Sequence, residues 1–264
     1  MTARPSIALL ALTLCCASPA AARDMPADPL QSPMWSDLSR VLLTDGAVTF
    51  DPRVIVAFPE IAENQRIFPV TIDARSLGDV RRILLFADLN PIPLAADFAP
   101  GEASAYLSIR IKLDQRTPVR AAVQTADGVW HVNGGWIDAA GGGCSAPPVS
   151  RVKGDWADHL GEIRGLAVAD GDTARMRLTF RHPMDTGLVD NISIYNLEQV
   201  AVQRDGATLA TLKLEASVAE DPALTLMVPA GTGDELSVDG RDTNGRTFHG
   251  KLTVAARPTR VAAR

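Results

Sequence analysis

The sequence has few aromatic residues, no surplus of basic charge and no long apolar segment beyond its beginning. Aromatic residues make up 5% of the 264 residues, which disfavours the aromatic platforms on which sugars or nucleobases stack. There are 26 Lys and Arg against 31 Asp and Glu, so the net charge of −5 gives no basic surface for nucleic acid. No stretch after residue 22 is apolar enough to cross a membrane, so we expect no membrane partner.

Metal-binding patterns are also missing from the sequence. It contains no CxxC, no HxxxH and no acidic loop of the calcium-binding type. A blue-copper site needs two histidines, a cysteine and usually a methionine. His182, Met184 and Cys144 supply these residue types, but without the spacing that such sites use. We therefore expect no metal and no other resident cofactor.

Residues 1–22 have the pattern of a secretory signal peptide. Arg4 gives a basic start, an apolar run follows at 7–17, and three alanines at 20–22 form a small-residue cleavage site. The apolar run is too short to span a bilayer. We expect export, with cleavage of this signal.

Cleavage would leave a single cysteine, because Cys15 and Cys16 lie within the signal and Cys144 is the only other one. In an oxidising compartment, an unpaired cysteine is a reactive thiol or has an intermolecular partner. A buried cysteine that acts as a small hydrophobic residue is the alternative.

The neighbours of Cys144 favour the reactive thiol. The stretch AAGGGCSAPP (139–148) surrounds Cys144 with glycines and prolines instead of apolar residues at strand or helix spacing. We predict an accessible thiol on a flexible mount formed by Gly141, Gly142 and Gly143. In a solvated site, Cys144→Ser should change stability by only ~0.5 kcal/mol or less.

Short strands dominate the rest of the chain. After one predicted helix within 32–46, alternating apolar and polar residues indicate two series of strands with no helices between them. The first series is expected at 54–58, 66–74, 80–88, 105–113, 118–126 and 129–138; the second is expected at 162–170, 174–183, 192–206, 207–216, 223–228, 234–240 and 246–256. Asp127-Gly128, Asp205-Gly206 and Asn244-Gly245 are typical hairpin turns.

This pattern predicts an all-β protein of two antiparallel β-sandwich domains in tandem, with a short N-terminal helix. The strand pattern is lost after residue 138 and returns near 161. We therefore place the first domain, which includes the helix, at 23–138 and the second at 161–264. Residues 139–160 form a connector with glycines and prolines, and this connector includes Cys144.

Catalysis by a cysteine and a histidine is a weaker hypothesis. The candidate bases are His131, His159, His182 and His249, of which His159 is nearest to Cys144 in sequence. A flexible glycine mount holds a nucleophile poorly, whereas catalysis needs fixed geometry. We expect a protein that is not an enzyme.

The string RHPMDTGLVDN (181–191) is the other unusual segment. It is most simply a strand end with its loop, because Pro183 cannot donate to a strand ladder and Met184 can fill the end of a sandwich. The alternative is a surface formed by His182, Pro183, Met184 and Gly187 that docks a partner or the Cys144 segment.

Several segments resemble a known family. PEIAENQRIFPVTIDARSLGDVRRILLFADLNPIPLAADFAP, YLSIRIKLDQRTPVRAAVQTADG and the glycine-cysteine ending resemble the SoxY subunit of the sulfur carrier SoxYZ of periplasmic thiosulfate oxidation. MRLTFRHPMDTGL, SVAEDPALTLMV and DELSVDGRDTNG resemble its SoxZ subunit. The resemblance covers nearly the whole chain after the signal. It is closest to fused SoxYZ-like carriers associated with quinoprotein (PQQ) dehydrogenase systems.

The resemblance implies immunoglobulin-like domains and a covalent role for one thiol. In the family, a cysteine on a glycine-rich arm at the C-terminus of SoxY holds sulfur intermediates while partner enzymes act on them. Cys144, after Gly142 and Gly143, matches this cysteine. Here Ser145 and Ala146 replace the glycines that follow it, and the arm continues into the second domain.

Two functions follow from the resemblance. The first is a periplasmic carrier that holds a covalent sulfur adduct on Cys144 and serves redox or sulfur-oxidation enzymes. The alternative is an accessory module that binds a quinoprotein dehydrogenase or a c-type cytochrome without carrying sulfur.

Overall fold

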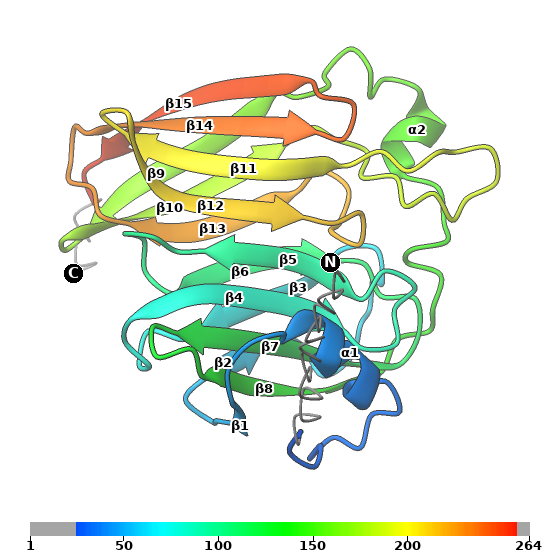
Figure 1. Cartoon of the computed structure of the whole chain (residues 1–264). Helices are drawn as coiled ribbons and strands as arrows, with labels where there is room; N and C mark the ends of the chain where they lie inside the picture. The colour runs from blue at the N-terminus through cyan, green and yellow to red at the C-terminus, as the bar shows by residue number, and fades with distance from the viewer. Residues whose placement is uncertain (1–24, 258–264) are drawn as a thin grey trace, which may run out of the picture.

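The computed structural model describes residues 25–257, and the signal peptide expected at 1–22 lies outside this range. The described chain is almost entirely β-structure, with two short helices (Figure 1). Its elements are α1 (Trp35–Leu42), β1 (Val48–Phe50), β2 (Ile55–Ala57), β3 (Phe68–Asp73), β4 (Val80–Ala87), β5 (Leu94–Ala99), β6 (Tyr106–Ile111), β7 (Thr117–Thr125), β8 (Trp130–Ile137), α2 (Val149–Lys153), β9 (Ile163–Asp170), β10 (Thr173–Phe180), β11 (Leu197–Arg204), β12 (Ala207–Leu214), β13 (Ala223–Val228), β14 (Glu235–Asp242) and β15 (Thr247–Ala255).

The all-β class and the N-terminal helix are confirmed, and each predicted strand is present. The three predicted turns join β7 to β8, β11 to β12 and β14 to β15, with Gly128, Gly206 and Gly245 at positive φ as such turns require. The sequence patterns missed β1, which has three residues, β5, in which half of the residues are alanine, and α2, which has five residues.

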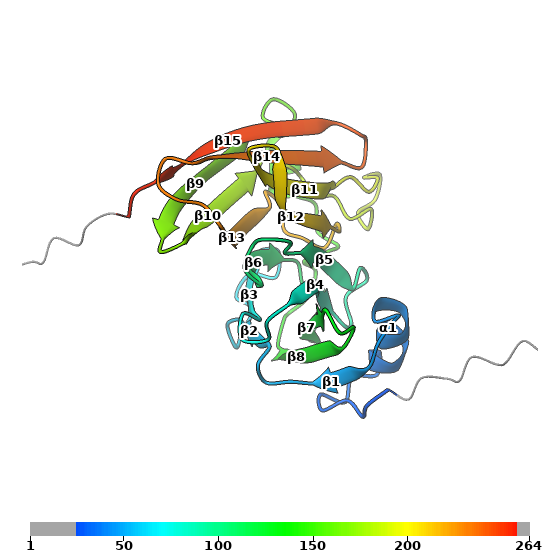
Figure 2. The ribbon, with the colours of Figure 1, turned by 60° about the vertical axis from the view of Figure 1, so that its left-hand side comes forward.

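The strands form one continuous 15-stranded sheet that folds over itself into two layers, here called the two sheets, and each layer runs through both halves of the chain. One layer has the order β1-β8-β7-β4-β5-β12-β11-β14-β15, the other has the order β2-β3-β6-β13-β10-β9, and the two join where β15 pairs parallel with β9. Strands β5 and β12 pair antiparallel, as do β6 and β13, so backbone hydrogen bonds cross from one half to the other in each sheet. Figure 2 shows the halves stacked with these four strands at their junction.

One hydrophobic core fills the space between the sheets in both halves. It includes Ile83 and Leu85 of β4 and Leu107 of β6 in the first half, and Leu178 and Val238 in the second. The halves are therefore joined by a shared core as well as by strand pairing. Such a junction fixes their relative orientation, because separation would expose apolar surface and unpaired strand edges.

A second, smaller core lies on the outer face of β4. Leu84 and Phe86 alternate with the inner residues of this strand and pack against Trp35 and Leu43 of the α1 region. Helix α1 thus covers the first half, as expected. No helix within residues 25–257 is long and apolar enough to cross a membrane.

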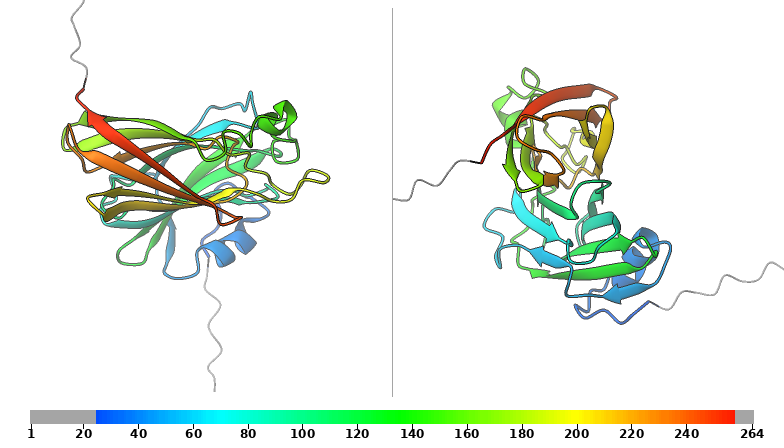
Figure 3. Two further views of the ribbon diagram at one scale, coloured as in Figure 1. Left: turned by 90° about the horizontal axis from the view of Figure 1, so that it is seen from above. Right: turned by 90° about the vertical axis from the view of Figure 1, so that its left-hand side faces the viewer.

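The chain between β8 and β9 runs along one end of the molecule. Figures 1 and 3 show α2 at this end, beside the long loop between β10 and β11. The segment expected to be an open connector therefore lies against parts of both halves.

Candidate functional site

Residues 139–148, here called the cysteine arm, are bonded to the chain that follows β6. The amide of Gly142 donates to the carbonyl of Asp114 at 3.3 Å, and that of Gly143 donates to Leu113 at 3.0 Å. The amide of Cys144 donates to Asp114 Oδ1 at 3.0 Å. These three bonds attach the arm to the first half of the protein.

The second half holds the arm from the other side. Thr186 Oγ1 donates to the carbonyl of Cys144 at 2.6 Å. The Lys112 ammonium donates to the carbonyls of Met184 and Ala216, with 2.7 Å to the latter. Cys144 thus lies in a seam formed by residues 112–114 of the first half and 184–186 of the second.

The prediction of an accessible thiol is wrong for this structure, because Cys144 is only 1% exposed. Its local neighbours are small, but the seam supplies the covering atoms from distant parts of the sequence. Burial raises the pKa of the Cys144 thiol to about 12, the charge of Asp114 adds to this, and Lys112 opposes it. Since the thiolate is the reactive form, the docked thiol is protected from nucleophilic and oxidative chemistry.

The glycines of the arm have a packing role in the docked state. A Cβ on Gly143 would lie 2.3 Å from the carbonyl oxygens of both Gln65 and Leu113, so a side chain does not fit there. Gly141 and Gly142 have φ values of 101° and 82°, which other residues rarely adopt. Close approach at Gly143 and positive φ at Gly141 and Gly142 therefore explain these glycines when the arm is docked, and their flexibility stays a prediction for a released arm.

The chain after Cys144 is also held on both sides. The Glu220 carboxylate accepts hydrogen bonds from the amides of Val149 and Ser150, at 2.7 and 2.6 Å, at the start of α2. Arg151 donates from Nε to both oxygens of the buried Asp185 carboxylate, at 2.9 and 2.8 Å. Glu220 and Asp185 therefore fasten the continuation of the arm to the second half, a contact that sequence reasoning did not find.

Arg66 and Trp156 complete the hold on this segment. Arg66 Nη1 donates to the carbonyl of Pro147 at 3.1 Å from the first half. The Arg151 guanidinium lies 4.2 Å from the centre of the Trp156 ring, which in turn packs edge-on against Tyr195. The predicted thiol segment is thus an ordered part of the interface.

The interpretation of His182, Pro183, Met184 and Gly187 as a partner-docking surface is wrong for three of the four. His182, Pro183 and Met184 are buried, and Gly187 alone is exposed. The amide of Leu197 lies 3.3 Å from Met184 Sδ, so this side chain fills the end of the second sandwich. The same loop holds the cysteine arm, which was the other alternative for this string.

His182 is buried in its neutral form. Its Nδ1 accepts a hydrogen bond from the amide of Met184 at 3.1 Å, which leaves the proton on Nε2. Burial lowers the pKa of His182 to about 4, despite the charge of Asp242. Nε2 has no hydrogen-bond partner in the described part of the chain, and it lies 3.9 Å from Asp242 Oδ2.

The remaining histidines bind carboxylates elsewhere. His131 contacts Asp51 at 2.8 Å, His159 contacts Glu162 at 2.6 Å, and His249 contacts Asp239 at 2.6 Å. None of these contacts includes Cys144. Residues 25–257 contain no group of three His, Cys, Asp or Glu side chains that could hold a metal ion.

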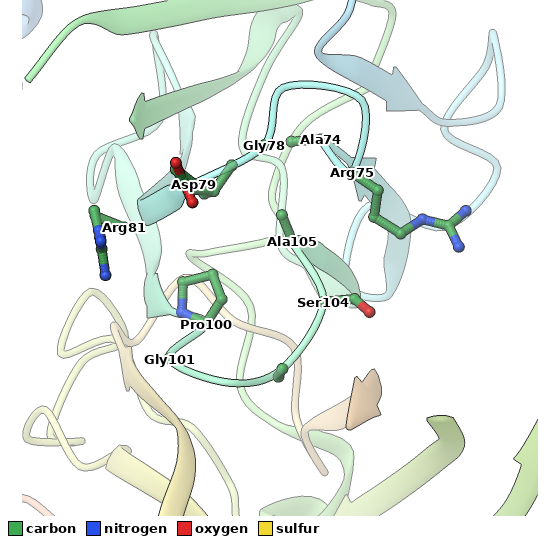
Figure 4. Close-up of a pocket in the computed structure, with 11 residues that line it drawn as sticks. Ala74, Arg75, Gly78, Asp79, Arg81, Pro100, Gly101, Ser104 and Ala105 are labelled. Carbon is green, nitrogen blue, oxygen red and sulfur yellow. The ribbon is translucent and has the colours of Figure 1, made fainter. Parts of the chain in front are cut away.

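A surface hollow in the first half is separate from the seam. It has a volume of about 370 Å³ and lies between residues 74–81 and 100–105. Figure 4 shows the Arg75 side chain on one side of it and Asp79 and Arg81 on the other. Neither Cys144 nor any residue of the seam lines it, so the hollow is not part of the candidate site.

Among solved structures, the chain is similar to the sulfur carrier protein SoxY from Chlorobium limicola f thiosulfatophilum. The two are 21% identical, with a TM-score of 0.36, over 40% of this chain and 94% of that one. A β-glycosidase from Bacteroides vulgatus is also similar, at 10% identity and a TM-score of 0.24, but the chain spans only 24% of its length. No curated protein matches the chain.

Two family models match the chain one after the other. The model of the sulfur oxidation protein SoxY matches residues 39–144, which end at the cysteine in the seam. The model of the sulphur oxidation protein SoxZ matches residues 163–253, which contain most of the second half. The chain therefore belongs to the SoxY and SoxZ families, with both domains in tandem on one polypeptide as a fused SoxYZ-like protein.

Proposed function

We propose that this protein holds sulfur-containing intermediates covalently on Cys144 and presents them to partner enzymes without converting them itself. The observation that carries the proposal is the position of Cys144 as the last residue of the SoxY match. It is also the only cysteine after residue 16, so no other thiol of the described chain could take this role. The preceding glycines allow a released arm to enter a narrow active site.

The docked arm is the storage state in this proposal. A buried thiol whose pKa is raised reacts slowly, so loading requires the cysteine arm to leave the seam. The contacts that hold it are hydrogen bonds from the arm's amides to Asp114 and Leu113, and one from Thr186 to the carbonyl of Cys144. Such bonds are exchanged for bonds to water at a net cost of about 1 kcal/mol each, so release can be reversible.

The released thiolate can take up sulfur by two routes. It can displace a leaving group from a sulfur donor, which requires no external oxidant. Alternatively, it can join an anionic sulfur donor, with two electrons passing to a partner. The second route needs a redox protein, for which a c-type cytochrome is a suitable class of partner.

The tethering of the arm limits which partners it can serve. The arm belongs to a connector that is fixed at both ends, and the tip of a doubled-back loop of about 18 connector residues extends at most ~30 Å. Release of α2 from Glu220 and Asp185 would be needed for the full reach. We therefore propose partners that dock at the end of the molecule where α2 lies.

The compartment and the partner system are further parts of the proposal. The pattern of residues 1–22 supports export to the periplasm. The joining of both domains in one chain supports the type of SoxYZ-like carrier associated with quinoprotein dehydrogenases. Sulfur-oxidation enzymes, a quinoprotein dehydrogenase and a c-type cytochrome are the partner classes to test.

Complementation of a deletion strain tests the carrier function. A strain that lacks this protein would receive the wild type, Cys144→Ser or Ser36→Ala, the last as a control at an exposed serine of α1 far from the seam in sequence. Growth that depends on the pathway should return with the wild type and the control, but not with Cys144→Ser. Full complementation by Cys144→Ser, at equal protein levels, would refute the carrier and favour the accessory module.

A further inference from the structure

Lys112 is a buried cation without a partner of opposite charge in direct contact. Lys112 is 4% exposed, and its ammonium donates to the carbonyls of Met184 and Ala216. An ammonium has three donors, and no acceptor in residues 25–257 is found for the third. No carboxylate of the described chain forms a direct ion pair with it. A buried, unpaired charge is costly, so this arrangement calls for an explanation.

The nearby carboxylates are engaged by other donors. Asp185 binds Arg151, and Glu220 accepts from the first amides of α2. Asp114 Oδ1 accepts from the amides of Cys144 and Ser145 and from the Ser145 hydroxyl. None of these three carboxylates therefore neutralises the charge of the Lys112 ammonium by direct contact.

Lys112 and Cys144 are held by the same two segments. Lys112 directly precedes Leu113 and Asp114, which bind the arm, and it bonds Met184 in the loop whose Thr186 bonds Cys144. Burial lowers the pKa of Lys112 to about 8, and the attraction of a Cys144 thiolate is the largest effect that opposes this. A neutral thiol in the seam cannot supply that attraction.

We propose that Lys112 is the counter-charge for an anionic sulfur group on Cys144 when the cysteine arm is docked, an inference that rests on the proposed carrier function. An adduct that ends in a sulfonate or a sulfide anion would place negative charge beside the Lys112 ammonium. The arm then docks in the seam more tightly when Cys144 carries an anionic group than when it carries a neutral group. Lys112 is a positioning residue that selects cargo by charge.

Two adducts that differ in charge provide the test. The thiolate of Cys144 attacks a central sulfur of tetrathionate, thiosulfate leaves, and the product is Cys144–S–S–SO3⁻. With methyl methanethiosulfonate, methanesulfinate leaves and the product is Cys144–S–S–CH3. In both reactions the thiol proton passes to solvent. The full chain with Cys15→Ser and Cys16→Ser confines each label to Cys144.

The measurement is the rate at which dithiothreitol removes each label from folded protein and from urea-unfolded protein. The ratio of the unfolded to the folded rate is the protection factor, and it cancels the intrinsic reactivity of each adduct. In the wild type, the sulfonate adduct should be protected on the order of tenfold more than the methyl adduct, as for one hydrogen bond to a charged group.

Variants at Lys112 show whether this residue causes the difference between the two protection factors. Lys112→Met should bring the two protection factors to within about twofold of each other, because it retains size without charge. Lys112→Arg should keep a preference for the sulfonate adduct. Arg110→Met removes an exposed cation of β6, two residues before Lys112, and should leave the preference unchanged.

Equal protection of the two adducts in the wild type would overturn the inference, even if Lys112→Met did not fold. A preference that persists in folded Lys112→Met would overturn it as well. Failure of Cys144 to accept either label, shown by intact mass, would instead count against the carrier function itself. The two proposals therefore fail in distinguishable ways.

Discussion

Gly143→Ala tests whether the cysteine arm docks as the structure shows. A Cβ at this position would lie 2.3 Å from two backbone oxygens, those of Gln65 and Leu113, which cannot move as a flexible side chain does. The φ of Gly143 lies outside the left-handed region, so alanine itself is not strained. The variant should therefore destabilise the docked arm through steric overlap alone.

The size of the effect follows from the cost of overpacking. An extra methyl in a well-packed site costs ~1–3 kcal/mol, which shifts the equilibrium toward the released arm by about 5- to 150-fold. The alkylation rate of Cys144 by iodoacetamide should rise by that factor, because only the released thiol reacts. The rate is measured at the Cys144 peptide by mass spectrometry, relative to the urea-unfolded chain.

Circular dichroism and the melting temperature establish that the variant is folded. Gly231→Ala is the matched control, since a Cβ there meets nothing within 4 Å. It should leave the alkylation of Cys144 unchanged. A folded Gly143→Ala protein that reacts as slowly as the wild type would show that the arm does not dock against Leu113 as described.

Three further predictions concern stability and the hold on the arm. Burial lowers the pKa of His182 to about 4 in the folded state, so its contribution of ~3 kcal/mol to the free energy of unfolding is complete above pH 6.5 and is lost as the pH falls toward 4. Urea unfolding at both pH values should show that loss for the wild type but not for His182→Asn. Cys144→Ser places a hydroxyl in a buried site and should cost ~1–3 kcal/mol in urea unfolding, whereas a cost near zero would support the solvated site predicted from sequence. Glu220→Gln weakens the charge-assisted bonds at the start of α2, so iodoacetamide should alkylate Cys144 about 2- to 5-fold faster, with no change expected for the exposed Glu60→Gln.

The sequence predicted the strands and hairpins well because these depend on local patterns. The alternation in 106–113 and the Asp-Gly turn at 127–128 are visible within a few residues. The pairing of β5 with β12 and of β6 with β13 was not predictable in this way, since it joins residues more than a hundred positions apart. Half of the six residues of strand β5 are alanine, so its alternation of apolar and polar side chains is weak.

The sequence singled out Cys144, whose covalent role stays a prediction, but the accessible surroundings expected for its thiol were wrong. Cys144 was found because it is a lone cysteine after a run of glycines. Its burial was missed because the covering groups come from Leu113 and Thr186, which are 31 and 42 residues away in sequence. Lys112 was missed for the same reason, since an isolated lysine at the end of a strand gives no signal of burial.

The intact mass of the protein isolated from its native host under non-reducing conditions tests the central claim most directly. If Cys144 is the covalent attachment point, part of the wild-type protein should be heavier by sulfur-containing groups that a thiol reductant removes. Folded Cys144→Ser protein from the same host should lack these additions. A wild-type protein that has only its unmodified mass while the pathway is active, or additions that persist in Cys144→Ser, would contradict the account.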